Sequence, residues 1–325
     1  MVISEAGPRA RLRILLVLEA ISLAVVGRRK VRSLAWKEAW EGRLFVAPWV
    51  LGFLIFTIGP MLASVYFAFS EYSVLSRAKW VGLDNFVKMF TRDRLFRLSL
   101  YNTAYFVFLS VPLNIVSSFL LALLLNVRIR GINLFRSLYY LPVITPGVAS
   151  ALTWSLVFSG EFGLFNALLR GVGLPTFNWL FDPKITKLIF VIMGLWGVGG
   201  AAIIFLAGLQ NVPQVLYEAA HIDGANFWHR FWHVTIPMMT PIIFFNLVQG
   251  IIGTFQVFTG AYIITAGGPA NSTLFYVLYL YNNAFKFFKM GYASALAWVL
   301  FVIILVFTLI QLRLARMWVY YEAAL

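Results

Sequence analysis

The sequence predicts an all-α polytopic membrane protein with six transmembrane helices. Hydrophobic residues make up 61% of the 325 positions, well above the roughly 45–50% of soluble domains. Mean hydropathy is +0.85, and the apolar residues gather in long runs. The 17% share of aromatic residues fits a protein with Trp and Tyr at two membrane interfaces. These observations exclude an ordinary soluble fold.

Residues 1–43 are predicted to form a cytoplasmic or interfacial N-terminal segment. They carry nine Lys and Arg residues, which flank an apolar run over residues 14–27. That run is shorter than the roughly 20 residues that a spanning helix needs, and no cleavage site of small residues follows it. We therefore expect an interfacial or re-entrant helix, with a short extra span as the alternative. Trp36 and Trp40, four residues apart, predict an amphipathic helix over residues 31–43.

Residues 44–325 are predicted to form the transmembrane domain. Each of its six apolar segments is long enough to cross a hydrocarbon core of about 30 Å as a helix. Helices are expected because backbone groups find no water partner in lipid. Pro60, Pro112 and Pro146 predict kinks or broken turns inside spans. The predicted spans are residues 44–70, 101–127, 137–158, 185–210, 238–265 and 292–314.

Six spans place both termini on the same side of the membrane. Lys and Arg are more frequent on the side of the N-terminus, mainly because of the first 43 residues, so both termini are predicted to be cytoplasmic. This orientation explains the net charge of +14 better than nucleic acid binding does. Short amphipathic helices are expected in the outer loops, at residues 84–90 and 165–169.

The motifs of several enzyme classes are absent or misplaced. The chain has no G-x-x-x-x-G-K-S/T phosphate loop and no cysteine. Gly197–Ala202 fits a dinucleotide-binding glycine pattern but lies inside a predicted span, where small residues favour helix packing. His229 and His233 could share a metal, yet no third ligand is near. We therefore expect no catalytic residue, no metal and no cofactor on this chain.

A polar connection over residues 211–237 interrupts the apolar chain between the fourth and fifth spans. It carries Glu218, Asp223, Arg230 and three histidines, although a short turn would join two helices. Small residues after Glu218 permit close approach to another surface, and Gly224 provides a position for a sharp turn. The composition indicates a docking element.

The spacing within this connection resembles the EAA loop of bacterial ABC importer permeases. The residues that carry it are Glu218-Ala219-Ala220-x-x-Asp223-Gly224-Ala225, with Ile236-Pro237 behind them. Two further segments, Trp80–Phe86 and Phe135–Pro142, look like the family's first outside loop and the entry to its third span. Three others, Gly253–Phe258, Thr265–Thr273 and Gly291–Ala295, are similar to the carbohydrate-uptake branch, in particular to the larger maltose permease subunit. The resemblance covers nearly the whole chain from Leu44, and only the N-terminal extension departs from it. It implies the type I ABC importer permease fold.

The resemblance also implies a coupling role for the loop. In that family the EAA loop forms a short helix that sits in a cleft of a cytosolic ATPase subunit, which binds ATP and Mg²⁺. The docking residues carried over are Glu218, Ala219, Ala220, Asp223, Gly224, Ala225, Phe227 and Trp228. The expected partners are a second homologous permease, an ATPase dimer, an extracytoplasmic solute-binding protein and membrane lipid.

Family members place sugar contacts on the spans before and after the EAA loop. The matching polar or aromatic candidates are Trp196, Gly197, Asn246, Gln249, Thr254 and Gln256. Amides and hydroxyls can bond a sugar and Trp can stack on it, although such groups also bond between helices for packing alone.

The sequence-based hypothesis is a permease subunit of a carbohydrate importer in a bacterial or archaeal cytoplasmic membrane. An importer for glycerol-3-phosphate or a polyol is the alternative. A polytopic membrane enzyme would need a cluster of acids or histidines at one membrane face. A passive channel would need a ring of charges or a filter-like stretch. Neither pattern is visible.

Overall fold

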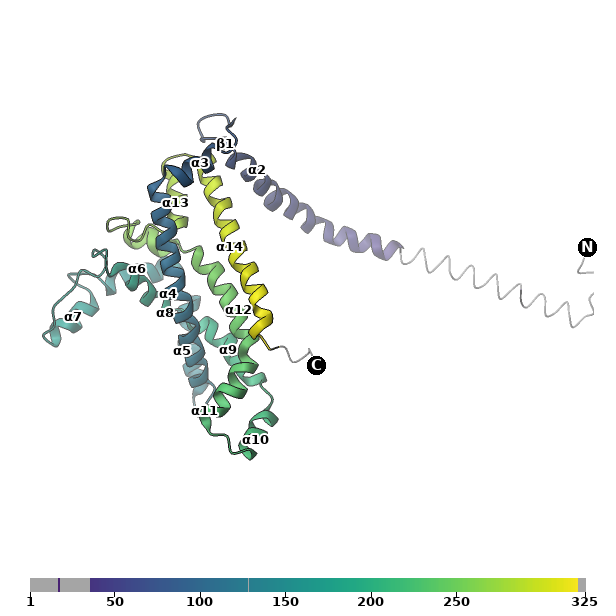
Figure 1. Ribbon diagram of the computed structural model, residues 1–325, viewed down its shortest axis with the longest axis vertical. Coiled ribbons are helices and arrows are strands. Elements are labelled where there is room, and N and C mark those ends of the chain that lie inside the picture. Colours follow the sequence, from purple (N-terminus) through teal and green to yellow (C-terminus); the bar gives the residue numbers. More distant parts are fainter. Residues whose placement is uncertain (1–16, 18–35, 128, 321–325) are drawn as a thin grey trace, which may run out of the picture. The chain divides into compact units, whose positions relative to one another are not determined.

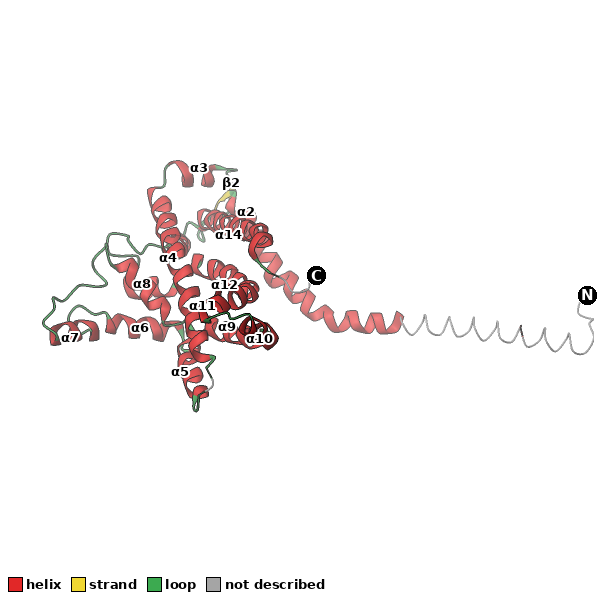
Figure 2. Ribbon diagram, turned by 60° about the horizontal axis from the view of Figure 1, so that its bottom comes forward, coloured by secondary structure: helices red, strands yellow, loops and turns green. Residues whose placement is uncertain are grey.

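The computed structural model describes Val17, residues 36–127 and residues 129–320 (Figure 1). Helices dominate this part of the chain, and its only strands are one pair of two residues each (Figure 2). The prediction of an all-α protein is therefore confirmed. Apart from Val17, the helix expected over residues 14–27 lies outside the described residues. The chain divides into two units, Met1–Ser64 and Val65–Leu325.

Apart from Val17, the described residues of the first unit all lie in one long helix, which continues into the second unit. It runs from Trp36 to Ala68 without a break at residue 43, so its last residues belong to the second unit. The helix includes a π-helical turn, η1 (Leu54–Ile58), and ends as α2 (Gly59–Ala68). The π turn lies just before Pro60, whose ring and missing N–H disturb the α-helical hydrogen-bond ladder.

The second unit is a bundle built around three long helices, α4, α12 and α14. Its outer helices α3 and α7 confirm the two short helices expected near residues 84–90 and 165–169. The elements are β1 (Ser70–Glu71), β2 (Lys79–Trp80), α3 (Asp84–Thr91), α4 (Arg94–Leu125), α5 (Ile132–Ile144), α6 (Gly147–Val157), α7 (Leu164–Gly171), α8 (Thr186–Leu195), α9 (Gly199–Asn211), α10 (Gln214–Ile222), α11 (Phe227–Arg230), η2 (Phe231–Thr235), α12 (Ile236–Phe255), η3 (Ala261–Thr265), α13 (Tyr276–Tyr281), η4 (Asn282–Lys286) and α14 (Met290–Trp318).

Four helical runs in the described part of the chain are long and apolar enough to cross a membrane: Trp36–Ala68, Arg94–Leu125, Phe227–Phe255 and Met290–Trp318. Two bent pairs, α5 with α6 and α8 with α9, bring the number to six if each pair makes one span.

The two bent pairs fall in the segments expected to span at residues 137–158 and 185–210. The axes of α5 and α6 differ by 98° and those of α8 and α9 by 45°. The first break falls at Thr145, which is extended because Pro146 disfavours a helical residue before it. The second break, at Trp196–Val198, contains no proline. Pro112 lies inside α4, which continues past it.

Apolar side chains of α4, α9 and α12 form a core near the polar connection. Phe119, Phe205 and Met239 are among its buried members. Close packing depends on Gly208, because a Cβ there would collide with the side chain of Ile242 on α12. The bundle is therefore densely packed where the polar connection leaves it.

At the end of the bundle far from the polar connection, polar contacts join residues that are distant in sequence. Asp93 accepts hydrogen bonds from the hydroxyls of Tyr279 and Tyr292, and so links the start of α4 to α13 and α14. The amide of Asn102, which is buried, donates to the carbonyl oxygen of Asn271 over 2.8 Å. These contacts hold α4, α13, α14 and the preceding turn together.

Candidate functional site

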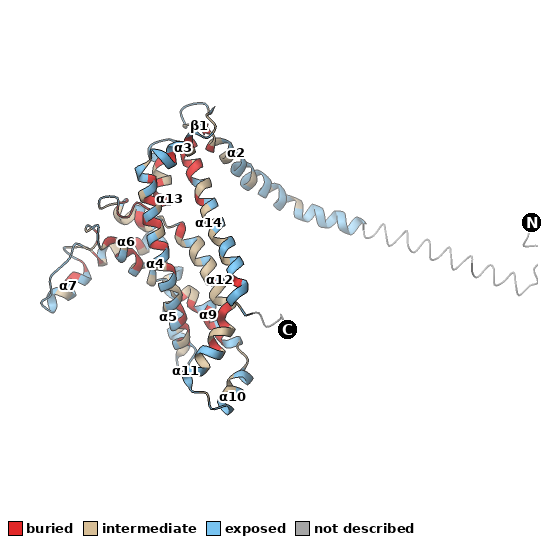
Figure 3. Cartoon of the chain, viewed as in Figure 1, coloured by how far each residue is buried: buried red, intermediate tan, exposed pale blue. Residues whose placement is uncertain are grey.

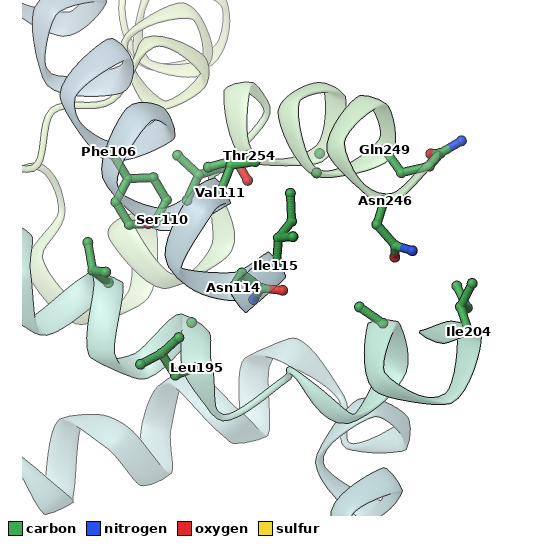
Figure 4. A pocket seen from close by; sticks show the side chains of 16 residues that line it. Phe106, Ser110, Val111, Asn114, Ile115, Leu195, Ile204, Asn246, Gln249 and Thr254 are labelled. Carbon is green, nitrogen blue, oxygen red and sulfur yellow. The ribbon is translucent and has the colours of Figure 1, made fainter. Parts of the chain in front are cut away.

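A cavity of about 480 Å³ lies between the helices of the second unit (Figure 4). Its walls come from α4, α8, α9 and α12, two of which, α8 and α9, form the pair that is bent by 45°. Amides, hydroxyls and apolar groups line it, and no lining side chain is charged. This composition suits an uncharged, hydroxyl-rich solute better than an ion.

Three sequence-predicted residues line this cavity from α12. They are Asn246, Gln249 and Thr254. Asn246 is buried, and its amide nitrogen donates to the carbonyl oxygen of Ile242 over 2.9 Å, within the same helix. Its carbonyl oxygen therefore stays available as an acceptor. Figure 4 shows Asn246 pointing into the space between the helices.

The wall formed by α4 adds two polar residues that the sequence analysis did not name. Ser110 and Asn114 lie one helical turn apart. The Ser110 hydroxyl is buried and finds no hydrogen-bond partner among the described residues, so its bonding capacity is unused. The Asn114 side-chain oxygen accepts from the Ser118 hydroxyl over 3.3 Å. In the sequence, both could have been recognised as isolated polar residues inside a long apolar run.

The other three substrate-path candidates do not line this cavity. Trp196 and Gly197 lie in the break between α8 and α9, where the Trp196 ring meets the Trp154 ring edge-on at 5.7 Å. Gln256 caps the end of α12, and its amide donates to the carbonyl oxygen of Ile252 over 3.0 Å. Although Trp196, Gly197 and Gln256 lie on the predicted spans before and after the loop, they do not reach this cavity.

The polar connection folds as two short helices joined by a tight turn. Helix α10 ends in a Schellman motif: the Gly224 amide donates to the His221 carbonyl over 3.0 Å, and the Ala225 amide to the Ala220 carbonyl over 2.9 Å. Gly224 has φ +78°, which favours glycine. Asn226 then caps α11 by accepting from the amide of His229 over 2.9 Å.

Helices α10 and α11 are mostly exposed (Figure 3), and so are most of the docking candidates that they carry. Glu218, Ala219, Asp223 and Gly224 are exposed, whereas Ala220 and Ala225 are half-buried at the turn. Phe227 and Trp228 are each 64% exposed. Ile222 is 85% exposed and was not named as a site residue. The sequence could have pointed to Ile222, because it is an apolar residue next to the turn of a polar loop. The large apolar side chains of Ile222, Phe227 and Trp228 are therefore exposed.

One contact lies within the connection and ties α10 to the start of the following helical run, and another joins the connection to the bundle. The Tyr217 hydroxyl on α10 bonds the Thr235 hydroxyl over 3.0 Å. The Phe231 ring packs against the Phe119 ring of α4, with centroids 6.2 Å apart. Moreover, Phe227–Phe255 is one helical run, which begins in the connection and carries Asn246, Gln249 and Thr254 further along.

The histidine pair on this run stacks without forming a metal site. The rings of His229 and His233 lie 5.5 Å apart and nearly parallel, and Nδ1 of His233 faces the carbonyl oxygen of His229 at 3.0 Å. Within the part of the chain that the structure describes, no three His, Cys, Asp or Glu residues are placed to hold a metal ion.

Comparisons with known proteins agree with this geometry. The chain is 44% identical over 299 residues to the probable ABC transporter permease protein YesP of Bacillus subtilis, covering 91% of this chain and 96% of that protein. It is 33% identical over 286 residues to the trehalose/maltose transport system permease protein MalF of Thermococcus litoralis, covering 87% and 96%.

A solved structure shares the fold. A chain of a bacterial alginate ABC transporter, crystallised in complex with an alginate pentasaccharide-bound periplasmic protein, superposes with a TM-score of 0.78 at 24% identity, covering 86% of this chain and 96% of that chain. Residues 105–319 match the family described as binding-protein-dependent transport system inner membrane component. The chain therefore belongs to this family of ABC transporter permeases, which are multi-pass membrane proteins and transport components rather than enzymes.

Proposed function

We propose that this permease imports a neutral sugar or oligosaccharide through the cavity between α4 and α12. The observation that carries the proposal is the wall chemistry: Ser110, Asn114, Asn246 and Thr254 offer hydroxyls and amides among apolar side chains. Sugars are recognised by such groups, and the relative from T. litoralis is named for trehalose and maltose. The uncharged lining favours a sugar or polyol over glycerol-3-phosphate.

The EAA loop is the proposed docking site for a cytosolic ATPase dimer, which binds ATP and Mg²⁺. Ile222, Phe227 and Trp228 would enter apolar pockets of the partner, and Glu218 and Asp223 would pair with its basic or donor groups. The small residues Ala219, Ala220 and Ala225 would allow the close approach. The exposure of the apolar residues supports this role.

Coupling follows from the continuity of the helical run. Trp228 and Asn246 lie 18 residues apart on Phe227–Phe255, so the docking surface and the cavity are separated by about 27 Å of helix. A displacement of the loop by the ATPase would therefore shift the polar wall of α12 against α4. Such a shift can open the cavity first to one side of the membrane and then to the other.

The complete importer would contain a second, homologous permease that closes the cavity and an extracytoplasmic solute-binding protein that delivers the sugar. The termini and the EAA loop would lie in the cytoplasm, as the Lys and Arg distribution predicts. The solved alginate transporter, crystallised in complex with a periplasmic protein, supports the solute-binding partner.

The decisive experiment is uptake by the assembled importer in proteoliposomes, with its binding protein and radiolabelled maltose, trehalose and glycerol-3-phosphate as separate probes. Asn246→Leu removes the amide at nearly constant volume and should lower sugar uptake at least tenfold. Gln256→Leu removes an amide outside the cavity and serves as the matched control. Equal uptake by both variants, or transport of glycerol-3-phosphate alone, would contradict the proposal.

A further inference from the structure

A second pocket is lined by residues around β1, α3 and the start of α14. These elements lie at the end of the bundle opposite to α10 and α11 (Figure 1). The pocket has a volume of about 430 Å³ and is framed by the β1–β2 hairpin, α3 and the first turn of α14. Four basic side chains line it: Arg77, Lys79, Lys88 and Lys289. Only two acids, Glu71 and Asp84, line it as well. At least two positive charges in the pocket therefore have no acidic counterpart there.

The four cations are not neutralised by neighbours. Among the described residues, none of them forms an ion pair within 4 Å or donates a side-chain hydrogen bond, not even Lys79 to Glu71, its partner across the hairpin. The Lys88 ammonium instead lies 5.7 Å from the centre of the Tyr292 ring. Basic side chains in excess over acids raise the electrostatic potential in a concave site, and an anionic ligand would lower it.

The walls of the pocket are fixed by hydrogen bonds that do not involve the cations. The Asn85 amide donates to the carbonyl oxygens of Ala68 and Ser70 over 2.9 and 3.0 Å, which ties α3 to the hairpin. The Gly291 amide donates to the carbonyl oxygen of Tyr72 over 3.0 Å, which ties α14 to the hairpin. The pocket is therefore preorganised, and a ligand need not order it.

The backbone beside Lys289 is strained. Phe288, which lines the pocket, has φ +54°, a conformation that an aromatic residue rarely adopts. The next amide, that of Lys289, donates to the carbonyl oxygen of Asn283 over 2.8 Å. The strained residue thus holds Lys289 at the rim of the pocket, as is common at binding sites.

We propose that this pocket binds a phosphate group. Arg and Lys form charge-assisted hydrogen bonds with phosphate oxygens, and the hydroxyls of Ser76 and Tyr72 add neutral donors. The volume exceeds that of one phosphate ion and admits a larger molecule that carries the group. The site is separate from the cavity between α4 and α12 and does not depend on which solute is imported.

Two sources can supply that chemistry, a phospholipid headgroup or a soluble phosphate compound. Two features make the lipid the first to test. The pocket is level with the start of α14, a helix long and apolar enough to span the membrane. In addition, the other flank of α3 borders a wholly apolar groove, lined by Phe86, Phe90 and Trp298 among others, against which acyl chains can lie.

The test compares three forms of the assembled transporter in neutral detergent: wild type, Arg77→Gln with Lys289→Gln, and Arg97→Gln with Lys184→Gln. The control pair is exposed, lies outside the pocket and removes the same charge. Bound phosphatidylglycerol is counted by native mass spectrometry against phosphatidylcholine, and inorganic phosphate is titrated by calorimetry. We expect the pocket variant to bind at least one probe about tenfold more weakly, with the control within about twofold of wild type.

Each outcome decides the proposal. Selective loss of phosphatidylglycerol identifies a lipid headgroup, and selective loss of inorganic phosphate identifies a soluble ligand. Equal binding of both probes by the pocket and control variants would overturn the proposal. A variant with Arg77→Lys and Lys289→Arg keeps both charges and should restore binding. Failure of this variant to bind better than the glutamine pair would show that the cations are not responsible.

Discussion

The substitution Gly224→Asp, compared with a matched control, distinguishes two effects on transport: backbone strain within the loop and disturbed contact with the ATPase. Gly224 has φ +78°, but no atom lies within 4 Å of the position that a Cβ would take. The substitution therefore meets no clash within the chain and costs only backbone strain, about 1–2 kcal/mol for an L-residue. Aspartate tolerates this conformation better than most residues, so the lower end applies. A cost of this size lowers the equilibrium population of the native turn by about 5- to 10-fold.

The assay measures sugar uptake and ATP hydrolysis by the importer in the same proteoliposomes. Gly224→Asp should insert normally and hydrolyse ATP, but its uptake should fall at least tenfold, because the new carboxylate enters the proposed contact with the ATPase. Gly173→Asp is the matched control. Gly173 has φ +75°, also with nothing within 4 Å, and it lies in the loop after α7. Its uptake should stay within about twofold of wild type.

Two results would refute the reasoning. If both variants lose uptake equally, positive-φ strain is responsible rather than docking. If Gly224→Asp transports like wild type, then Gly224 does not lie at the contact.

Three further predictions follow. Gly253→Leu should abolish uptake and leave the melting temperature within about 3 °C, because nothing lies within 4 Å of a Cβ at this cavity residue. Asn166→Ala should speed hydrogen exchange across residues 160–180, because the buried amide makes four hydrogen bonds and losing them costs about 2–4 kcal/mol locally. Burial raises the pKa of Asp93, but hydrogen bonds from Tyr279 and Tyr292 and from two backbone amides outweigh it and hold the pKa below 3.8. The stabilisation by Asp93 is therefore present above pH 3.8 and lost as the pH falls through its lowered pKa, so Asp93→Asn should destabilise the detergent-solubilised protein at pH 7 but not at the lowest pH.

Hydrophobic runs predicted the helices well because length and apolarity alone decide whether a segment can span lipid. A break at Pro146 was expected, but its angle of 98° between α5 and α6 was not, and no residue pattern predicted the 45° bend at Trp196–Val198. A bend leaves the composition of a run unchanged. Whether a helix breaks depends on what packs against it, as at Gly199, where a Cβ would collide with the Tyr139 carbonyl of α5.

The candidate cavity was predictable only in part for a related reason. Asn246 and Thr254 share a helix, so their spacing in the sequence already places them near one another. Ser110 and Asn114 come from α4, more than 130 residues earlier, and no local pattern pairs them with α12. The same limit applies to Asp93 and Tyr292, whose contact exists only after α4 and α14 are assembled.

The distribution of contacts also bears on where a conformational change can occur. Far from the EAA loop, buried polar groups join four separate elements, as in the bonds of Asn102 to Asn271 and of Asp93 to Tyr279. Beside the loop, the contacts described above are one hydroxyl pair, Tyr217 with Thr235, and apolar packing, both of Phe231 and within the core that includes Phe119, Phe205 and Met239. Apolar surfaces can slide with little loss, whereas buried hydrogen bonds must break before their elements separate. A force applied at the loop should therefore move the nearby halves of α9 and α12 first, with the opposite end as the fixed point, and so change the cavity that lies between.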